Sequence, residues 1–591
     1  NSVMSDFNIQ ASLPLSSLLR KAQRHVKAEE FAQATILYRE ALFRFPKNKT
    51  ALKEYKNLKG LIALQNVSNS QVSQEQIQEL IGLYEQGKFE EVLSKANYLT
   101  NLFPKAMTLY DLRGATNAKL KNFDEAINIF KQALKMNPNH LEAYLNIGNV
   151  LQEKGELDAA IDSYKQALKL KSDYAEVHYN MGIALKKKGD LDAAIFSNKQ
   201  VIKIIPDHVE AFNNMGNALQ AKEDIDGAIS SYKKALKINP NHAEANYNIG
   251  NALKEKGQLD SAIKAYNAAT HVKPDYADAL CNLSIVKNLQ GDLKNGFELY
   301  EWRCKIRDPL IWPARSQFVW SNNKPINGKH FFIYEEQGIG DVIQFSRYLP
   351  LLEQKGAKVS FEVRSNLHAL LQTMDSRVSL RTSFPEESKI DFEAPLMSLP
   401  NLLNTSLETI PATNPYLYAD HDRTRNWGER FGKDRFKIGI CWQGSKSKVD
   451  FGRSFPLSLF EGISKTPNVE LISLHKGEGE DQIANIDFDV TTLGPDFDAG
   501  PDAFVDTAAV MMNCDLIITS DTAVAHLAGA LGCQTWVALK HIPDWRWMLN
   551  RSDSPWYPTM TLYRQKDRGD WANVFYAIKH DLSLLIDRKG Q

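Results

Sequence analysis

This sequence has little cysteine and no long hydrophobic runs. The five cysteines are scattered, and none has a CxxC or zinc-site spacing: Cys281, Cys304, Cys441, Cys514 and Cys533. This distribution argues against a disulfide framework and predicts a reduced, cytoplasmic protein. No apolar run approaches the roughly 18 residues that a membrane-spanning helix needs, so we expect no membrane span.

An excess of charge of one sign is also missing. Lys+Arg and Asp+Glu both number 71, so no global field favours nucleic acid or an anionic membrane. The start, Asn1-Ser2-Val3 before Met4, is interpreted as an expression remnant and not as a signal peptide. A chain of 591 residues is too long for one core, so we expect two or more domains.

The first half of the chain repeats every 34 residues. The unit 141–172 has two stretches of apolar residues spaced three and four apart, with Gly155 between them, which predicts two amphipathic helices joined by a glycine turn. Small residues recur where the helices would cross: Gly114, Gly148, Gly182, Gly216 and Gly250 in the first helix, and Ala126, Ala160, Ala194, Ala228 and Ala262 in the second. The pattern resembles the tetratricopeptide repeat. We predict an α-solenoid superhelix over 1–310, with a helical insertion near 47–70.

One polar residue recurs in the same register. Its positions are Asn146, Asn180, Asn214, Asn248 and Asn282. In tetratricopeptide folds the first helix of each pair lines a long groove, so these residues are predicted to form a ladder inside it. A carboxamide both donates and accepts hydrogen bonds, which suits the backbone of an extended peptide. The alternative is that each asparagine bonds within or between repeats and binds no partner.

From about residue 328 short apolar strands alternate with helices, as in open parallel sheets. Strands are predicted at 331–334, 358–363, 437–442, 469–474, 516–519 and 535–539, with helices at 342–352, 366–373, 503–512 and 522–531. The pattern restarts after a polar stretch, which predicts two facing lobes, 311–425 and 426–575. A last helix, placed at about 570–586 and assigned to a segment 576–591, is expected to cross back to the first lobe.

The segment 516–532, LIITSDTAVAHLAGALG, combines a buried strand, a polar corner and an alanine-rich helix. Backbone N–H groups at the start of such a helix are suited to binding a diphosphate. Thr522 can add a hydroxyl donor, and His526 lies one helical turn further on. Alternatively, Asp521 caps the helix and His526 is a structural partner.

This Asp-Thr-x-x-x-His-Leu-x-x-Ala-x-Gly pattern resembles that of bacterial heptosyltransferases, glycosyltransferase family 9. The region 328–588 is still more similar to bacterial proteins that join tetratricopeptide repeats to such a domain, through the segments 335–352, 543–549 and 553–560. The resemblance implies a GT-B fold, which consists of two facing Rossmann-like domains. It also implies inverting transfer without a metal, with a nucleotide-diphosphate sugar as donor and no further cofactor.

The same resemblance implies roles for individual residues. Asp341, in Gly340-Asp341-Val342, would be the general base that takes the acceptor proton. The donor side would comprise Gly340, Gln443, Gly444, Ser445, Arg453, Lys476, Asp521, Thr522, Ala523 and His526. Ala523 stands where the family has glycine, and the heptose-binding residues have no clear counterparts, so the sugar stays open.

Three other patterns in the sequence resemble known sites. Asp487-Phe488-Asp489 and Asp496-Phe497-Asp498 have the DxD spacing of metal-dependent transferases, in surroundings that do not match them. Gly338-x-Gly340 lacks the third glycine of a dinucleotide fingerprint. The aromatic segment 545–557, placed after the last strand, could stack on a sugar or base or pack at a domain junction.

Together these patterns predict a glycosyltransferase that moves a sugar to a Ser or Thr hydroxyl of a polypeptide bound by the repeats. One alternative is a protein-binding scaffold with a vestigial transferase fold, and another is a transferase acting on a glycan or lipid acceptor. The expected partners are a polypeptide and a nucleotide-sugar, with no nucleic acid. A homodimer is compatible with the sequence.

Overall fold

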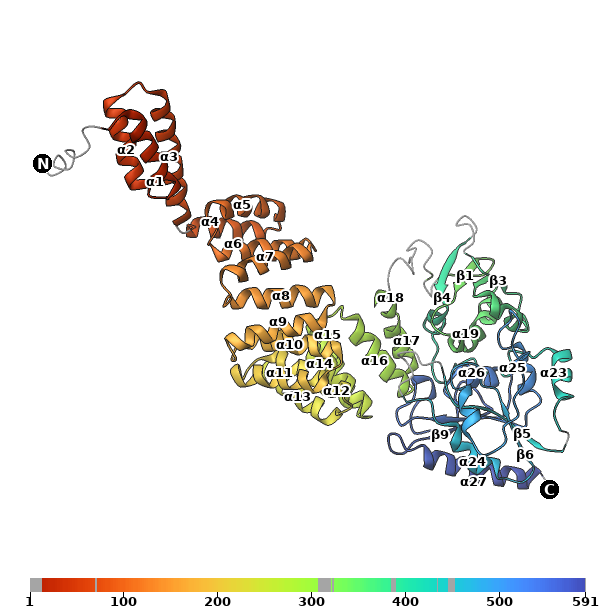
Figure 1. Ribbon diagram of the computed structural model, residues 1–591. Helices are drawn as coiled ribbons and strands as arrows, with labels where there is room; N and C mark the ends of the chain where they lie inside the picture. The colour runs from red at the N-terminus through yellow and green to blue at the C-terminus, as the bar shows by residue number, and fades with distance from the viewer. Residues whose placement is uncertain are drawn as a thin grey trace. The chain divides into compact units, whose positions relative to one another are not determined.

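The structure is a computed structural model that describes residues 13–69, 72–306, 320, 324–383, 390–432, 434–444 and 452–589. The chain divides into two compact units, Asn1–Asp224 and Ile225–Gln591, and each is described by itself. Figure 1 shows helices alone in the first unit, and helices followed by two sheets in the second. None of the described helices is long and apolar enough to cross a membrane.

The described part of the first unit is an α-solenoid. Its helices are α1 Leu15–Lys27, α2 Phe31–Arg44, α3 Lys49–Asn69, α4 Gln74–Glu85, α5 Phe89–Leu102, α6 Met107–Lys119, α7 Phe123–Met136, α8 Leu141–Lys154, α9 Leu157–Leu170, α10 Ala175–Lys188, α11 Leu191–Ile204 and α12 Val209–Ala221. α3 lies where the helical insertion is predicted. α8 ends at Gly155 with a φ of 86°, a left-handed conformation that glycine adopts without strain. The glycine turn of the sequence pattern is therefore a helix C-cap.

The recurring small residues let paired helices pack closely. A Cβ added at Gly148 would lie 2.4 Å from Cε1 of Tyr164, the aromatic residue of the next helix. Tyr164 is fully buried against α8, and its hydroxyl donates to Asn149 Oδ1 at 2.8 Å. Glycine in the first helix and an aromatic residue in the second therefore form one contact in each such pair.

Neighbouring repeats are joined by ion pairs with one spacing. A lysine at the end of a first helix pairs with an aspartate 30 positions earlier, near the start of the preceding second helix. In the first unit these pairs are Lys154–Asp124 at 2.9 Å, Lys188–Asp158 at 2.5 Å and Lys222–Asp192. Lys256–Asp226 repeats the arrangement in the second unit. Exposed pairs of this kind contribute little to stability, but the set repeats the same contact at each step of the stack.

The second unit begins with more repeat helices. They are α13 Ile225–Ile238, α14 Ala243–Glu255, α15 Leu259–Val272, α16 Ala277–Leu289, α17 Leu293–Tyr300 and α18 Arg303–Ile306. Two parallel sheets follow. The first has the order β3-β2-β1-β4, and the second β6-β5-β7-β8-β9. Their strands are β1 His330–Tyr334, β2 Lys358–Glu362, β3 Ser379–Arg381, β4 Phe392–Pro395, β5 Phe436–Cys441, β6 Val469–Ser473, β7 Leu516–Ser520, β8 Thr535–Leu539 and β9 Met560–Arg564.

Helices lie between most of the consecutive strands, as is usual for the crossovers of parallel sheets. They include α19 Ile339–Phe345, α20 Leu349–Gln354, α21 His368–Leu371, α22 Leu399–Leu402, α23 His421–Gly428, α24 Glu461–Ser464, α25 Val505–Met511, α26 Ala523–Ala530 and α27 Trp571–Lys589. Every residue of β7 and β8 is buried, which explains why these strands are continuous apolar runs.

The two compact units divide between α12 and α13, so α13–α18 belong to the same unit as the sheets. The aromatic ring of Phe297 in α17 packs on Trp545, 5.6 Å between centroids, and buried Arg303 pairs with buried Glu336 at 2.6 Å. The last helix does not cross back to the first lobe. It is continuous over Trp571–Lys589 and buries Phe575 and Ile578 in the core of the second sheet.

Candidate functional site

A cavity of about 810 Å³ lies where the carboxyl ends of strands from both sheets meet. Its lining comes from segments that follow β1, β2, β5, β6, β7 and β8, the usual location of ligand sites in open parallel sheets. Ten residues singled out in the sequence line it: Gly340, Asp341, Gln443, Gly444, Arg453, Lys476, Asp521, Thr522, Ala523 and His526. Ser445, also predicted there, lies outside the described residues.

Asp341 is held from two sides. Its Oδ2 accepts a hydrogen bond from the Gly338 amide at 2.8 Å, and Arg546 donates to its Oδ1. Burial raises the pKa of Asp341, although the charge of Arg546 acts in the opposite direction. A carboxylate with a raised pKa binds a proton more readily than an exposed aspartate, which is what a general base needs.

Two charged residues of the site were missed by the sequence reasoning. Arg546 was noted only within the aromatic segment, yet it donates to Asp544 Oδ1 at 2.9 Å and to Gln344 Oε1 at 2.8 Å as well as to Asp341. Burial opposes ionisation of Asp544, but Arg546 outweighs it and the pKa of Asp544 is lowered. The segment Asp544-Trp545-Arg546-Trp547 was the available signal for these two residues. It places an aspartate and an arginine among tryptophans, and such charges are rarely buried without partners.

The start of α26 lies close to the start of α19, the helix that carries Asp341. A Cβ on Gly340 would lie 3.0 Å from His526 Cδ2 and 3.5 Å from Ala523 Cα. Glycine therefore lets the start of α19 reach the start of α26. Thr522 stands at the N-cap of α26 in an extended conformation, and its carbonyl oxygen accepts a hydrogen bond from the Ala525 amide at 3.0 Å. Thr522, and not Asp521, is the N-cap residue, so the capping interpretation of Asp521 is wrong.

The half-buried carboxyl group of Asp521 and the buried imidazole of His526, both beside this helix, have shifted pKa values. Burial, with the charge of Asp544 adding to it, raises the pKa of Asp521 to about 6. Burial, aided by Arg546, lowers the pKa of His526 to about 3, so the imidazole is neutral at pH 7. His526 Nδ1 lies 3.0 Å from the Tyr557 hydroxyl, and its ring stacks on Trp547 at 5.3 Å between centroids. His526 therefore has a structural partner as well as a place in the cavity wall.

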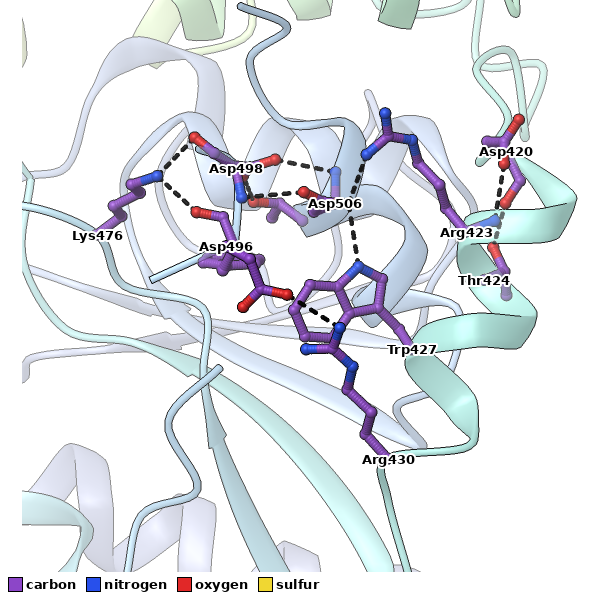
Figure 2. Close-up of polar contacts among 11 residues, drawn as sticks. Asp420, Arg423, Thr424, Trp427, Arg430, Lys476, Asp496, Asp498 and Asp506 are labelled. Carbon is purple, nitrogen blue, oxygen red and sulfur yellow. Dashed lines mark hydrogen bonds and ion pairs between the residues drawn. The ribbon is translucent and has the colours of Figure 1, made fainter. Parts of the chain in front are cut away.

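Figure 2 shows the polar contacts that hold the segment around Asp496 and Asp498. Lys476 Nζ donates to the carbonyl oxygens of Phe497 and Asp498, at 2.5 Å each. The Asp498 carboxylate accepts from the Asp506 amide at 2.9 Å and from the Thr507 hydroxyl. Lys476 therefore holds this segment by two hydrogen bonds and also lines the cavity.

The same network reaches α23. Asp506 accepts from the Trp427 indole at 3.0 Å and from Arg423 at 2.8 Å, while Asp496 pairs with Arg430 at 2.9 Å. The acids of the second DxD pattern are therefore engaged by protein donors.

Carboxylates outnumber cations in the described part of the lining. Six acids, Asp341, Glu478, Asp498, Asp502, Asp521 and Asp544, face three cations, Arg453, Lys476 and Arg546. Arg546 is neutralised by Asp341 and Asp544, so an anionic ligand would depend on Arg453 and on the amides of α26. The Arg453 guanidinium lies over Gly444, where a Cβ would be 2.8 Å from Nη2.

The ladder asparagines are all half-buried. In the first unit Asn180 Nδ2 donates to Asn149 Oδ1 of the preceding repeat at 3.0 Å. In the second unit Asn282 donates to the Tyr247 hydroxyl at 3.0 Å and accepts from Lys254 Nζ at 2.9 Å. At these two positions the carboxamides bond within the solenoid, as the structural alternative predicts.

The aromatic segment packs rather than lining the cavity with its rings. Trp545, Trp547, Trp556 and Tyr557 are each at most 3% exposed. Trp545 contacts Phe297 and Tyr300 of α17, at 5.6 and 6.3 Å between centroids. This segment does not follow the last strand, as the sequence suggested, because β9 comes after it. Its tryptophans join the last repeat helices to the second sheet.

Comparison with known proteins defines the class of the repeats. Models described as TPR repeat and Tetratricopeptide repeat match residues 148–189, 118–162, 218–282 and 175–208. These segments are therefore tetratricopeptide repeats, and a region of parallel sheets follows them in the chain.

Particular relatives resemble parts of the chain. Protein FlbA of Caulobacter vibrioides is 28% identical over 280 residues, which are 43% of this chain and 46% of FlbA, so the chain spans less than half the length of that relative. Among solved structures, MamA is 29% identical over 28% of this chain and 96% of its own, with a TM-score of 0.27. YrrB, described as a TPR protein with an unusual peptide-binding site, is 24% identical over 32% of this chain and 94% of its own, with a TM-score of 0.26.

Proposed function

We propose that this protein is a scaffold whose repeats bind an extended polypeptide. The repeats themselves carry the proposal, because stacked tetratricopeptide units present a continuous surface to a linear partner. The half-buried carboxamides of Asn146 and Asn214, which stand at one position of the repeat, supply donors and acceptors for a peptide backbone. Binding of this kind would depend little on the sequence of the peptide.

The test replaces Asn146 and Asn214 by alanine in the full chain. Fluorescence anisotropy with a panel of labelled 15-residue Ser/Thr-rich peptides should show affinity weakened about 10-fold or more, since each lost hydrogen bond is worth about 1 kcal/mol. Asn139→Ala with Asn241→Ala is the matched control, because both side chains are exposed between repeats. Equal affinity for the ladder variant and the wild type would show that the ladder is structural.

A second candidate function, glycosyl transfer in the cavity, is favoured by one observation. A half-buried carboxylate, Asp341, lines the same cavity as the start of α26, at the carboxyl ends of two parallel sheets. This arrangement supports the GT-B resemblance. In the proposed reaction Asp341 takes the proton of an acceptor hydroxyl, and the oxygen attacks the anomeric carbon of a nucleotide-diphosphate sugar. The diphosphate leaves on the opposite face, with its charge held by Arg453 and the α26 amides instead of a metal.

Nucleotide binding would distinguish a glycosyltransferase from a scaffold with a vestigial transferase fold. Differential scanning fluorimetry with UDP, GDP, ADP, CDP and their common sugars should reveal a stabilising nucleotide. Asp341→Asn should keep that stabilisation and lose 10²-fold or more in transfer or donor hydrolysis, as removal of a general base does. Arg453→Gln should instead weaken nucleotide binding. If no nucleotide stabilises the wild type, the chain is a scaffold alone. If a glycan accepts the sugar and the ladder substitutions leave the rate of that transfer unchanged, the chain is instead a transferase that acts on a glycan or lipid acceptor.

A further inference from the structure

The loop that joins β1 to α19 leads directly to Asp341. It comprises residues 335–338, and Gln337 and Gly338 line the cavity. Because α19 begins at Ile339, the conformation of this loop decides where Asp341, in the first turn of the helix, places its carboxylate. The contacts that fix the loop therefore bear on the wall of the cavity.

One residue of this loop has a strained backbone. Gln337 has a φ of 65°, in the left-handed region that residues other than glycine seldom adopt. A residue keeps such a conformation only where the surrounding contacts hold it there. Gln337 is therefore the point at which the conformation of the loop depends on its neighbours.

The last repeat helices supply those contacts. Gln337 Nε2 donates to the hydroxyl of Tyr300, the final residue of α17, at 2.6 Å. The preceding residue, buried Glu336, accepts from Arg303 of α18 at 2.6 and 3.1 Å. Arg303 also donates to the Tyr300 carbonyl at 3.2 Å, so α17 and α18 support the loop together.

The other end of the loop is bound to Asp341 itself. The Gly338 amide donates to Asp341 Oδ2 at 2.8 Å, and the Gly338 carbonyl accepts from the amides of Asp341 and Val342 at 3.1 and 3.2 Å. A change at Gln337 would therefore move the residue that both begins α19 and orients the carboxylate. Contacts thus run from Tyr300 on a repeat helix, through two loop residues, to the cavity.

We propose that Tyr300 is a positioning residue, through which the last repeat helices hold the Asp341 carboxylate in the cavity wall. The Tyr300 hydroxyl keeps Gln337 in its left-handed conformation, and the loop then fixes the start of α19. The described lining of the cavity contains no residue of the repeat helices, so the effect of the repeats on it is indirect. The positioning does not depend on the reaction in the cavity, whereas its consequence for glycosyl transfer rests on that proposed function.

Removal of one hydroxyl group tests the proposal in the full chain. In Tyr300→Phe, hydrogen exchange of the amides over 338–342 should accelerate about 5-fold or more, because the strained loop loses the bond that fixes it. Mass spectrometry of peptic fragments would measure this. Tyr266→Phe is the matched control, because it also removes a buried hydroxyl of a repeat helix, one that donates to Asn251 at 2.7 Å. The control should leave exchange over 338–342 unchanged.

A second substitution separates positioning from packing. Glycine adopts a φ of 65° without strain, so Gln337→Gly should keep the loop in place without the Tyr300 hydroxyl. Tyr300→Phe combined with Gln337→Gly should therefore return exchange over 338–342 to within about 2-fold of the wild type. A defect caused by altered packing around the Tyr300 ring would not be restored by a change in another residue.

Carboxyl labelling measures the effect at Asp341. In the wild type Asp341 is half-buried and bonded to Gly338 and Arg546, so a carbodiimide with an amine nucleophile should label it slowly. Tyr300→Phe should accelerate this labelling, and the double variant should label at the wild-type rate. Exposed Asp567 calibrates the reagent and should react equally in all three proteins.

Three outcomes would overturn the inference. The first is unchanged exchange over 338–342 and unchanged labelling of Asp341 in Tyr300→Phe. The second is a defect that Gln337→Gly leaves unrestored, since Tyr300 would then contribute packing alone. The third is an equal defect in Tyr266→Phe, which would indicate a general loss of stability. If the loop responds as expected but sugar transfer is unchanged in Tyr300→Phe, the positioning stands and the proposed role of Asp341 in transfer fails.

Discussion

At the scale of single residues, the repeats depend on a contact between glycine and an aromatic ring. Gly114, Gly148 and Gly250 each lie against a ring in the next helix, where a Cβ would come within 2.4 to 2.6 Å of a ring carbon. Gly182 is the exception, because Asn198 replaces the aromatic residue and the nearest atom to a Cβ would be 3.1 Å away. The same position is therefore filled in two ways within one solenoid.

This difference predicts opposite outcomes for one substitution. Gly148→Ala should destabilise its helix pair by about 1–3 kcal/mol, because the methyl group would overlap the buried Tyr164 ring. Gly182→Ala should be close to neutral, since Asn198 can yield and alanine favours the helix. Hydrogen exchange of the α8–α9 and α10–α11 amides would measure both effects locally. Equal loss of protection in the two variants would contradict the packing argument.

The residues of the cavity differ in how well the sequence could reveal them. Asp341, Thr522 and His526 stand in short segments directly after strands, and the order of strands in a parallel sheet brings such segments together. Asp544 and Arg546 also follow a strand, but they lie among buried tryptophans that suggested packing. Their roles depend on Gln344 and Asp341, about 200 positions away in the chain, and no local pattern contains that information.

At the scale of elements, strands with a continuous apolar run were predictable and strands without one were not. The predicted strand 535–539 is β8 itself, and 437–442 is within a residue of β5. β3 has three residues, none of them buried, β4 ends at Pro395, and β9 mixes arginine and threonine with apolar residues. These three strands lack the continuous apolar run that marks a buried strand, so they were missed.

One predicted helix proved to be three pieces. The apolar pattern over 342–352 favoured a single helix, whereas the structure has α19, a short 3-10 turn at Ser346–Tyr348, and α20. Pro350 stands in the first turn of α20, where proline is tolerated and where a continuous helix would lose a hydrogen bond. The break leaves Arg347 buried, with its guanidinium donating to the Trp556 carbonyl at 2.6 Å.

At the scale of the whole molecule, repeats and sheets share one compact unit. The buried Arg303–Glu336 pair and the Phe297–Trp545 contact join α17 and α18 to the sheet region. Periodicity ends near 310, so the sequence suggested a boundary there. Packing between elements distant in sequence, which periodicity does not report, places the last repeats with the sheets.

This organisation predicts where the chain can be cut. A fragment 225–591 should fold and unfold cooperatively, whereas 311–591 should aggregate or unfold at much lower temperature. The shorter fragment leaves Glu336 buried without Arg303, which costs about 3–5 kcal/mol, and exposes the tryptophans that α17 covers. Calorimetry and size-exclusion chromatography of the two fragments would decide. A monomeric 311–591 with the melting temperature of the longer fragment would refute the shared unit.

The lysine and aspartate pairs between repeats have a consequence for how this protein can change over generations. Each pair uses a lysine as donor, an aspartate as acceptor and the same separation of 30 positions. An in-frame duplication or deletion of 34 codons would therefore recreate an existing lysine–aspartate pair between repeats and require no compensating substitution. The solenoid can lengthen or shorten in single steps while the sheet region is inherited intact.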